Sequence, residues 1–385
     1  MAETTPLLRL AVWLILGIIT GVYSHVAMHV FLVAMSLTLV VCLFFFKKPL
    51  LQSVLIALTV FLLGATLAAR QPQTVSRNTA KDNPAKSLLL KRYQDNGLSN
   101  EAYVIVAAMT LGDRTAISKE LRNTYSISGA SHILALSGLH MGIIYALLSL
   151  LTLGHRRRLL VQVFSVITIW GYVIMVGMPA SAVRAATMIS VYALLSLGYR
   201  ERTSLNALAF TAIVMLVINP RILFDIGFQM SFMAVFSILL WTPLIQPLVP
   251  EKIQLRHRWV KWLWGMVTIS VTAQLGVAPL IAYYFGRFSV CFLLTNFVVI
   301  PGATIILWLS PLVLLTAKLA PVLSTLITTM NSTLKFITTL PGASIEGLHP
   351  TVVQTILIYV LIAIVYIIII ITNPNLGSTS RTWLT

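Results

Sequence analysis

Apolar runs of about 20 residues recur along the whole sequence, and a helix of that length is sufficient to cross a lipid bilayer. Hydrophobic residues make up 58% of the chain and charged residues only 10%. A soluble domain of this length does not have that balance, because its surface needs polar groups. We therefore predict an all-α, polytopic membrane protein with about 10–12 transmembrane helices and further amphipathic helices at the membrane interface.

The apolar runs define the expected membrane-spanning helices. These cover residues 7–23, 26–46, 50–69, 131–153, 159–177, 180–198, 204–218, 226–248, 261–285, 290–316 and 352–372. The stretch 320–340 is rich in Thr and Ser and only moderately apolar, so it either crosses the membrane or lies flat. Residues 87–111 form an amphipathic segment, interrupted at Asn96-Gly97, which lies along the membrane surface or against the helical bundle.

Basic residues indicate which loops face the cytoplasm. The chain has 27 Lys and Arg but only 10 Asp and Glu, and short cytoplasmic loops collect Lys and Arg. The loops placed inside on this basis are Lys47-Lys48, His155–Arg158, Arg200–Arg202 and 251–261. Nine further basic residues lie between Arg70 and Arg122, in a region predicted to be exported, where the positive-inside rule does not hold for long segments. With about twelve crossings, 320–340 included, both ends of the chain are cytoplasmic, whereas without that crossing the C-terminus would lie outside.

The stretch from Ser128 to Leu153 is apolar enough to cross a bilayer, yet its first half is polar and rich in small residues. The residues of this kind are Ser128, Gly129, Ser131, His132, Ser137, Gly138 and His140. At membrane depth such residues face a neighbouring helix or a water-filled path, because lipid cannot satisfy their hydrogen bonds. We therefore predict that this helix belongs to the working interior, with Ser137, Gly138 and His140 as candidate functional residues.

Three other stretches have the same character. Residues 177–186 contain an Arg one turn after the start of a helix lined with small residues. Residues 225–232 begin a helix with an acid, a Gln and a Ser. Residues 274–279 are expected to interrupt a helix within the membrane. Pro and Gly there free backbone carbonyls that need a partner or water. The candidate residues from these stretches and from the following helix are Ser181, Arg184, Asp225, Gln229, Ser231, Gln274 and Asn296.

Arg184 allows two interpretations. A guanidinium near the membrane interior costs several kcal/mol unless it faces an acid or a cavity. A structural pair with Asp225, which would hold two helices together, and exposure to a passing phosphate are both compatible with the sequence. The other polar candidates are likewise either hydrogen-bond partners between helices or ligand contacts.

The sequence predicts neither a metal site nor a cofactor. The seven His residues form no His-Glu-x-x-His motif and no His-x-His-x-Asp-His cluster. A Gly-x-x-x-x-Gly-Lys motif for nucleotide binding is also missing. His140 follows Ser137 by three residues on one helix face, which does not establish a serine protease dyad. Cys42 and Cys291 lie in apolar runs and are expected to be core residues rather than a disulfide.

Several motifs, in order, resemble the competence domain of the ComEC family. The matching residues are Leu111–Arg114, Ser128-Gly129, Leu136–Gly142, Pro179–Ala185, Asn219-Pro220, Asp225–Ser231, Gln274–Pro279, Tyr284-Phe285, Phe288-Ser289, Asn296 and Pro301. The resemblance implies a multi-pass protein of the bacterial inner (plasma) membrane that acts as a channel for DNA uptake in natural transformation. It would carry single-stranded DNA into the cytoplasm, with the ten candidate residues along or near its path.

The resemblance also implies partners. They are single-stranded DNA, membrane lipid, and a separate nuclease, DNA receptor and helicase of the uptake machinery, together with a possible second copy of the chain in a homo-oligomer. A DNA strand carries one negative charge per nucleotide, so its path needs basic or hydrogen-bonding groups. The nine basic residues between Arg70 and Arg122 either gather DNA at the outer mouth or form a solvated loop.

Two domains of full-length ComEC proteins are not expected here. Residues 70–110 are too few for the usual exported OB-fold and show no alternating strand pattern. The metal-binding motif of a nuclease domain similar to metallo-β-lactamases is also missing, so we expect a reduced family member that is not an enzyme. The predicted division is 1–69 for N-terminal transmembrane helices, 70–127 for a short exported linker with an amphipathic segment, 128–372 for the channel domain and 373–385 for a polar tail.

Two functions of other classes stay open. One is a transporter for a smaller anionic solute, which a narrow lumen without basic residues at its outer end would favour. The other is a non-conducting scaffold homologue, which a lumen blocked by bulky apolar side chains would favour.

Overall fold

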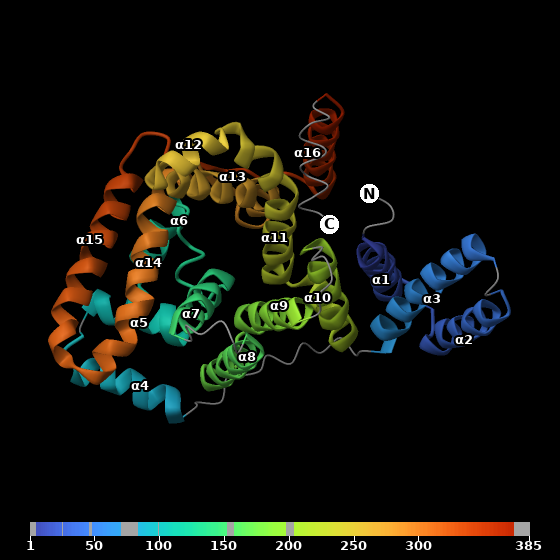
Figure 1. The fold of residues 1–385 in the computed structure, drawn as a ribbon, viewed down its shortest axis with the longest axis horizontal. Helices are drawn as coiled ribbons and strands as arrows, with labels where there is room; N and C mark the ends of the chain where they lie inside the picture. The colour runs from blue at the N-terminus through green and yellow to red at the C-terminus, as the bar shows by residue number, and fades with distance from the viewer. Residues whose placement is uncertain are drawn as a thin grey trace. The chain divides into compact units, whose positions relative to one another are not determined.

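The computed structural model describes residues 5–24, 26–45, 48–70, 84–98, 100–151, 158–197 and 204–372. In these ranges the regular structure is almost entirely helical (Figure 1), which confirms the predicted all-α class. The strands among the described residues are two three-residue segments, β1 (Arg287–Ser289) and β2 (Ser344–Glu346).

The helices follow the apolar runs of the sequence closely. Their bounds are α1 Pro6–Tyr23, α2 Met28–Phe44, α3 Pro49–Arg70, α4 Pro84–Asp95, α5 Asn100–Leu111, α6 Lys119–Ile127, α7 Gly138–Leu151, α8 Arg158–Met175, α9 Ala180–Leu197, α10 Ser204–Ile218, α11 Ile226–Ile245, α12 Glu251–Arg256, α13 Arg258–Phe285, α14 Phe292–Leu315, α15 Ala320–Thr338 and α16 Val352–Thr372. Short 3-10 turns, among them η2 (Pro220–Phe224), η3 (Gln246–Leu248) and η4 (Ala317–Leu319), connect some of them.

Six helical segments of the described chain are long and apolar enough to cross a membrane. They are Pro6–Tyr23, Pro49–Arg70, Ile226–Leu248, Arg258–Phe285, Phe292–Leu315 and Val352–Thr372. Six shorter apolar helices accompany them within the same described residues. The protein is therefore a multi-pass membrane protein, whereas the expected total of about 10–12 crossings stays a prediction.

The helices form two compact units. The first contains α1, α2, α3, α10, η2 and the beginning of α11, up to Phe232. The second contains α4 to α8, most of α9, the rest of α11 and the elements from η3 to α16. The four-part division expected from the sequence stays a prediction. The basic loops at 155–157 and 200–202, the linker residues 71–83 and the tail 373–385 lie outside the described residues.

In the first unit, α1 and α3 approach each other through glycines. A Cβ placed on Gly17 would lie 1.9 Å from the Phe61 carbonyl oxygen, and one on Gly21 would lie 2.4 Å from the Ala65 carbonyl oxygen. From the other side, a Cβ on Gly64 would lie 2.4 Å from the Leu14 carbonyl oxygen. The two backbones therefore touch directly, as in other helix pairs that use small residues at their interface.

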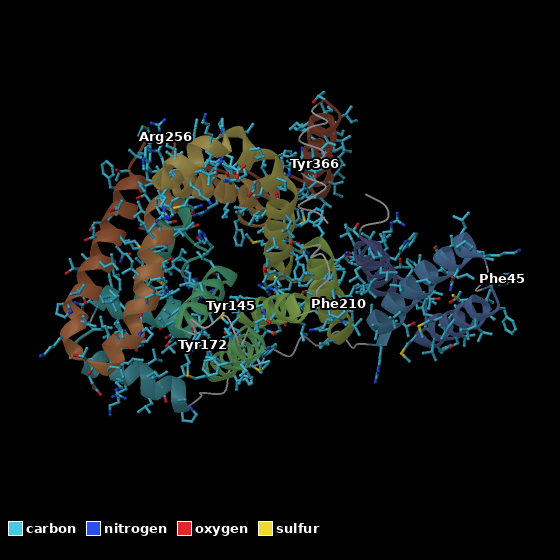
Figure 2. All side chains as sticks on the ribbon, viewed as in Figure 1. Phe45, Tyr145, Tyr172, Phe210, Arg256 and Tyr366 are labelled. Atoms are coloured by element: carbon cyan, nitrogen blue, oxygen red, sulfur yellow. The ribbon has the colours of Figure 1, made fainter. Side chains whose placement is uncertain are left out.

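In the second unit, the amphipathic segment expected at 87–111 packs against the helical bundle. It breaks where the Asn96-Gly97 turn predicts, into α4 and α5, and nearly all of α5 from Ile105 onward is buried. The Asn96 side chain donates to the Val313 carbonyl at 2.7 Å, near the end of α14. On α8, the Tyr172 hydroxyl donates to the Thr110 carbonyl at the end of α5 (Tyr172 is labelled in Figure 2).

Two helices differ from their predicted form. The central helix begins at Gly138 rather than at residue 131, because residues 131–135 form turns and bends. The helix expected to break at 274–279 instead continues as α13 through Pro279 to Phe285. The Tyr359 hydroxyl on α16 donates to the Gly276 carbonyl at 2.7 Å, so a neighbouring helix supplies a polar partner at this point.

The strands β1 and β2 join two connections that are distant in sequence. They pair antiparallel, with Phe288 opposite Ile345 and Ser289 opposite Ser344. β1 lies between α13 and α14, and β2 lies between α15 and α16. Between them, α14 and α15 run side by side (Figure 1).

Candidate functional site

Ser137 and His140 together cap the N-terminus of α7. The His140 Nδ1 atom accepts the backbone N–H of Ser137 at 2.9 Å, and the Ser137 hydroxyl lies at 2.9 Å from the same nitrogen. This is one half of a capping box, in which a side chain three residues into the helix reaches back to the backbone of the cap residue. Histidine takes the place of the usual Glu or Gln. Because Nδ1 accepts, the proton of the neutral ring is on Nε2.

The cap explains why the central helix begins at Gly138. We expect His140→Ala to lower the free energy of unfolding by about 1 kcal/mol through the cap alone, with the loss of a fully buried side chain adding to this. His140→Gln should recover the part due to the cap, because its amide oxygen can accept the same N–H. Thermal unfolding of the detergent-purified protein measures both. If His140→Gln is no more stable than His140→Ala, the capping interpretation is wrong.

Arg184 lies in the second turn of α9 and is only 5% exposed. The start of α9 is next to the start of α7, because a Cβ on Gly138 would meet the Ala185 Cβ at 3.9 Å. Ser181, one turn before Ala185, is half-buried. The structure thus brings the polar beginning of α7 close to the helix that carries the buried guanidinium.

In the first unit, the candidates lie where η2 joins α11. Asp225 is exposed and caps α11, its Oδ1 accepting the backbone N–H of Phe228 at 2.8 Å. Gln229 donates its amide to the Leu223 carbonyl at 3.0 Å. Ser231 is half-buried on the same helix. Asp225 and Gln229 therefore stabilise the start of α11 through these hydrogen bonds.

In the second unit, Asn296 connects α14 to α13. Its Nδ2 donates to the Ser270 hydroxyl at 3.0 Å, so Asn296 is a hydrogen-bond partner between helices, one of its two predicted roles. Gln274 is half-buried one turn after Ser270 on α13. Near it, α13 and α11 meet closely, since a Cβ on Gly276 would lie 2.4 Å from the Met233 carbonyl oxygen.

The candidates thus fall into separate groups. Ser137, Gly138, His140, Ser181 and Arg184 share the region where α7 and α9 begin. Gln274 and Asn296 belong to α13 and α14, and the remaining candidates to the first unit. The pairing of Arg184 with Asp225 and the placement of the whole set along a conduction path stay predictions.

Sequence reasoning missed several polar contacts that bridge distant helices. Tyr125, fully buried on α6, donates its hydroxyl to the Asn331 Oδ1 at 2.7 Å, and Asn331 donates to the Glu101 carboxylate at 2.9 Å. Burial, and secondarily the charge of Glu101, raise the pKa of the Tyr125 phenol. The polar residues of α15 gave a general signal for such contacts, but their partners lie more than 200 positions away.

No cluster of three or more His, Cys, Asp and Glu side chains suited to a metal ion occurs among the residues that the structure describes. Cys42 and Cys291 are free and half-buried, as expected for residues of apolar runs. The candidate residues are therefore neutral hydrogen-bonding groups, one buried arginine and one acidic helix cap, Asp225.

Comparisons with known proteins agree with the motifs. The family model described as "Competence protein" matches residues 109–371, more than half of the chain. ComE operon protein 3 of Bacillus subtilis (strain 168) is 34% identical over 206 residues, which are 52% of this chain and 24% of that protein. Recombination protein 2 of Haemophilus influenzae is 24% identical over 234 residues, 56% of this chain and 28% of that protein. The matched segments thus span about a quarter of the length of these two relatives, and no solved structure matches.

Proposed function

Because this chain belongs to the competence protein family, as its motifs predicted, we propose that it forms an inner-membrane channel for single-stranded DNA in natural transformation. The observation that carries the proposal is the extent of the family match, which runs from the end of α5 to the end of α16. It includes the second unit from the end of α5 onward and, in the first, α10 and the start of α11.

The chemistry of the candidate residues supports this proposal. A DNA strand carries one negative charge per nucleotide, and lipid-like walls would oppose its passage. Arg184 offers a cation within a helical bundle, and the cap at Ser137 and His140 places neutral polar groups at the start of α7. Sequence-tolerant contacts of this kind suit a strand whose bases vary.

In this proposal, the chain lets the DNA strand pass through the membrane and catalyses no chemical step. Capture of DNA outside, removal of the complementary strand and the driving force then belong to a receptor, a nuclease and a helicase. Such partners are consistent with the sequence, which carries no nucleotide-binding motif of the Gly-x-x-x-x-Gly-Lys type.

Transport into proteoliposomes tests the proposal directly. Vesicles containing the purified protein enclose a nuclease that cleaves both single- and double-stranded DNA, and a fluorescent oligothymidylate with a quencher is added outside. We expect a fluorescence increase that depends on the protein and is absent for an equally long duplex. Protein-free vesicles with the same enclosed nuclease control for leakage.

The alternatives give different results in the same vesicles. Uptake of inorganic phosphate or a mononucleotide, without the oligonucleotide, would indicate a transporter for smaller anions. Uptake of neither solute would favour a non-conducting scaffold. Both outcomes would contradict the channel proposal.

A further inference from the structure

The short helix α6 carries a basic stripe that none of the candidate residues uses. Lys119, Arg122, Asn123 and Ser126 are spaced by three and four residues, so they lie on one side of the helix. Lys119, Arg122 and Asn123 are exposed. Leu121 and Tyr125 are buried in the core of the second unit, and this fixes the direction in which the stripe faces.

Arg287 extends this stripe from a distant part of the chain. Its Nη1 donates to the Ser126 hydroxyl at 2.9 Å and reaches the Asn123 Oδ1 at 3.5 Å. Both acceptors are neutral, so these contacts orient the guanidinium without cancelling its charge. The side chain is half-buried, which leaves part of the guanidinium open to a ligand.

A further arginine lies close to the same stripe. Partial burial, and then the like charge of Arg122, lower the pKa of the Arg114 guanidinium. Arg114 is in the loop between α5 and α6 and remains charged at neutral pH because its pKa starts far above that range. Two guanidinium groups that repel each other favour a bound anion.

The acidic side chains of this region differ in their partners. Glu120 forms an ion pair with Lys335 of α15 at 3.1 Å. Asp113 accepts the backbone N–H and the hydroxyl of Thr115 at 3.1 and 2.8 Å, and these neutral donors orient the carboxylate without cancelling its charge. Glu346 is exposed and lies opposite Arg287 in the β1–β2 ladder.

We propose that Lys119, Arg122, Asn123, Ser126 and Arg287, here named the α6 basic face, bind the phosphodiester backbone of single-stranded DNA. Cations and neutral donors on one surface match phosphate oxygens without reading bases. The predicted topology places the turn before α14 outside, so this face would meet the incoming strand. The inference rests on the proposed function, because it names where that channel contacts its substrate.

The salt dependence of binding tests the assignment. Fluorescence anisotropy of a labelled oligothymidylate is followed against the full-length protein in phosphatidylcholine nanodiscs, at several salt concentrations. For single strands, the slope of log K against log salt is about −0.7 per phosphate neutralised. Lys119→Gln combined with Arg122→Gln should therefore make the slope less negative by about 1.4 and weaken binding several-fold at low salt.

The matched control removes the same two side-chain types elsewhere. Lys252 and Arg256 are exposed and four residues apart on the short helix α12 (Arg256 is labelled in Figure 2). Lys252→Gln with Arg256→Gln lowers the net charge equally and should change the slope by clearly less. An equal change in the two double variants would mean that net charge alone decides binding, and would overturn the proposal.

A substitution at Glu346 is expected to change oligonucleotide binding in the opposite direction. Glu346→Gln removes a negative charge opposite Arg287 and is expected to strengthen oligonucleotide binding, which a merely unfolded variant cannot do. Unchanged or weaker binding would count against the α6 basic face.

Two further outcomes distinguish this proposal from the binding of an anionic lipid and from the channel proposal. If the double variant on α6 instead loses phosphatidylglycerol bound to the purified protein while its oligonucleotide affinity is unchanged, an anionic lipid occupies the face and the proposal is wrong. If it binds and transports the oligonucleotide like the wild type, this inference fails while the channel proposal stands. If the wild type binds the oligonucleotide but does not transport it, the channel proposal fails while this inference stands.

Discussion

Replacement of Arg184 by alanine is expected to reduce the transfer of DNA into the cytoplasm roughly ten- to a hundredfold. A hydrogen bond to a charged group contributes about 1.5–3 kcal/mol, and each 1.4 kcal/mol corresponds to a factor of ten. Arg184 is nearly buried beside the polar start of α7, so solvent would not replace the contact with a phosphate that we propose for it. Uptake of labelled DNA, at matched protein levels in the membrane, measures the effect.

Further variants separate a role in transfer from a role in folding. Arg184→Lys keeps the charge and should retain part of the activity, whereas Arg9→Ala removes an exposed arginine of α1 and should retain all of it. In the competing structural interpretation, Arg184→Ala and Asp225→Ala each lower stability, and the double variant is little worse than either one. Normal transfer by a well-folded Arg184→Ala protein would remove Arg184 from the DNA path.

Replacement of Gly17 by alanine is expected to separate α1 from α3. The new Cβ would lie 1.9 Å from the Phe61 carbonyl oxygen and 2.8 Å from the Phe61 carbonyl carbon. These are backbone atoms of a helix and cannot rotate away. The free energy of unfolding should therefore fall by more than the roughly 1–3 kcal/mol that is typical of an overpacked core. The expected result is a large drop in the unfolding temperature and in the yield of monodisperse protein.

The same substitution at Gly171 provides the control. Gly171 lies within α8, and a Cβ there would meet no atom within 4 Å. Alanine is favoured over glycine in a helix by about 1 kcal/mol, so Gly171→Ala should leave stability unchanged or raise it. Equal effects of the two substitutions would show that the contact between α1 and α3 is not as close as described.

The sequence predicted most helices because membrane-spanning segments are defined by length and apolar composition, and both are local properties. The limits of α1, α8 and α9 agree with prediction within a residue or two. The start of α7 was missed because Ile133, Leu134 and Leu136 continue the apolar run upstream of the helix. Only the contact of His140 with the Ser137 backbone shows where the helix begins.

The candidate site was less predictable because its geometry depends on distant partners. Asn296 was recognised as polar within an apolar run, but its partner Ser270 carried no distinguishing signal. The contact of Arg287 with Ser126 was not predictable, since the two residues lie 161 positions apart. Pro279 predicted a break in α13 because proline removes a hydrogen bond, whereas the helix continues through it.

The pairing of β1 with β2 also requires that the chain between them crosses the membrane an even number of times or not at all. The chain leaves the ladder into α14 and returns to it from α15, so this excursion begins and ends on one side of the bilayer. If α14 crosses, α15 must cross back, although its composition left both arrangements open.

The hydroxyls of α15 show how a Thr-rich helix can tolerate lipid. Thr325, Thr328, Thr329 and Thr333 each donate to the carbonyl one turn earlier, at 2.8–2.9 Å. Their hydrogens are therefore satisfied within the helix, and the exposed face presents methyl groups. A hydropathy scale that assigns each threonine the hydration of a free hydroxyl thus underestimates how readily such a helix enters the membrane.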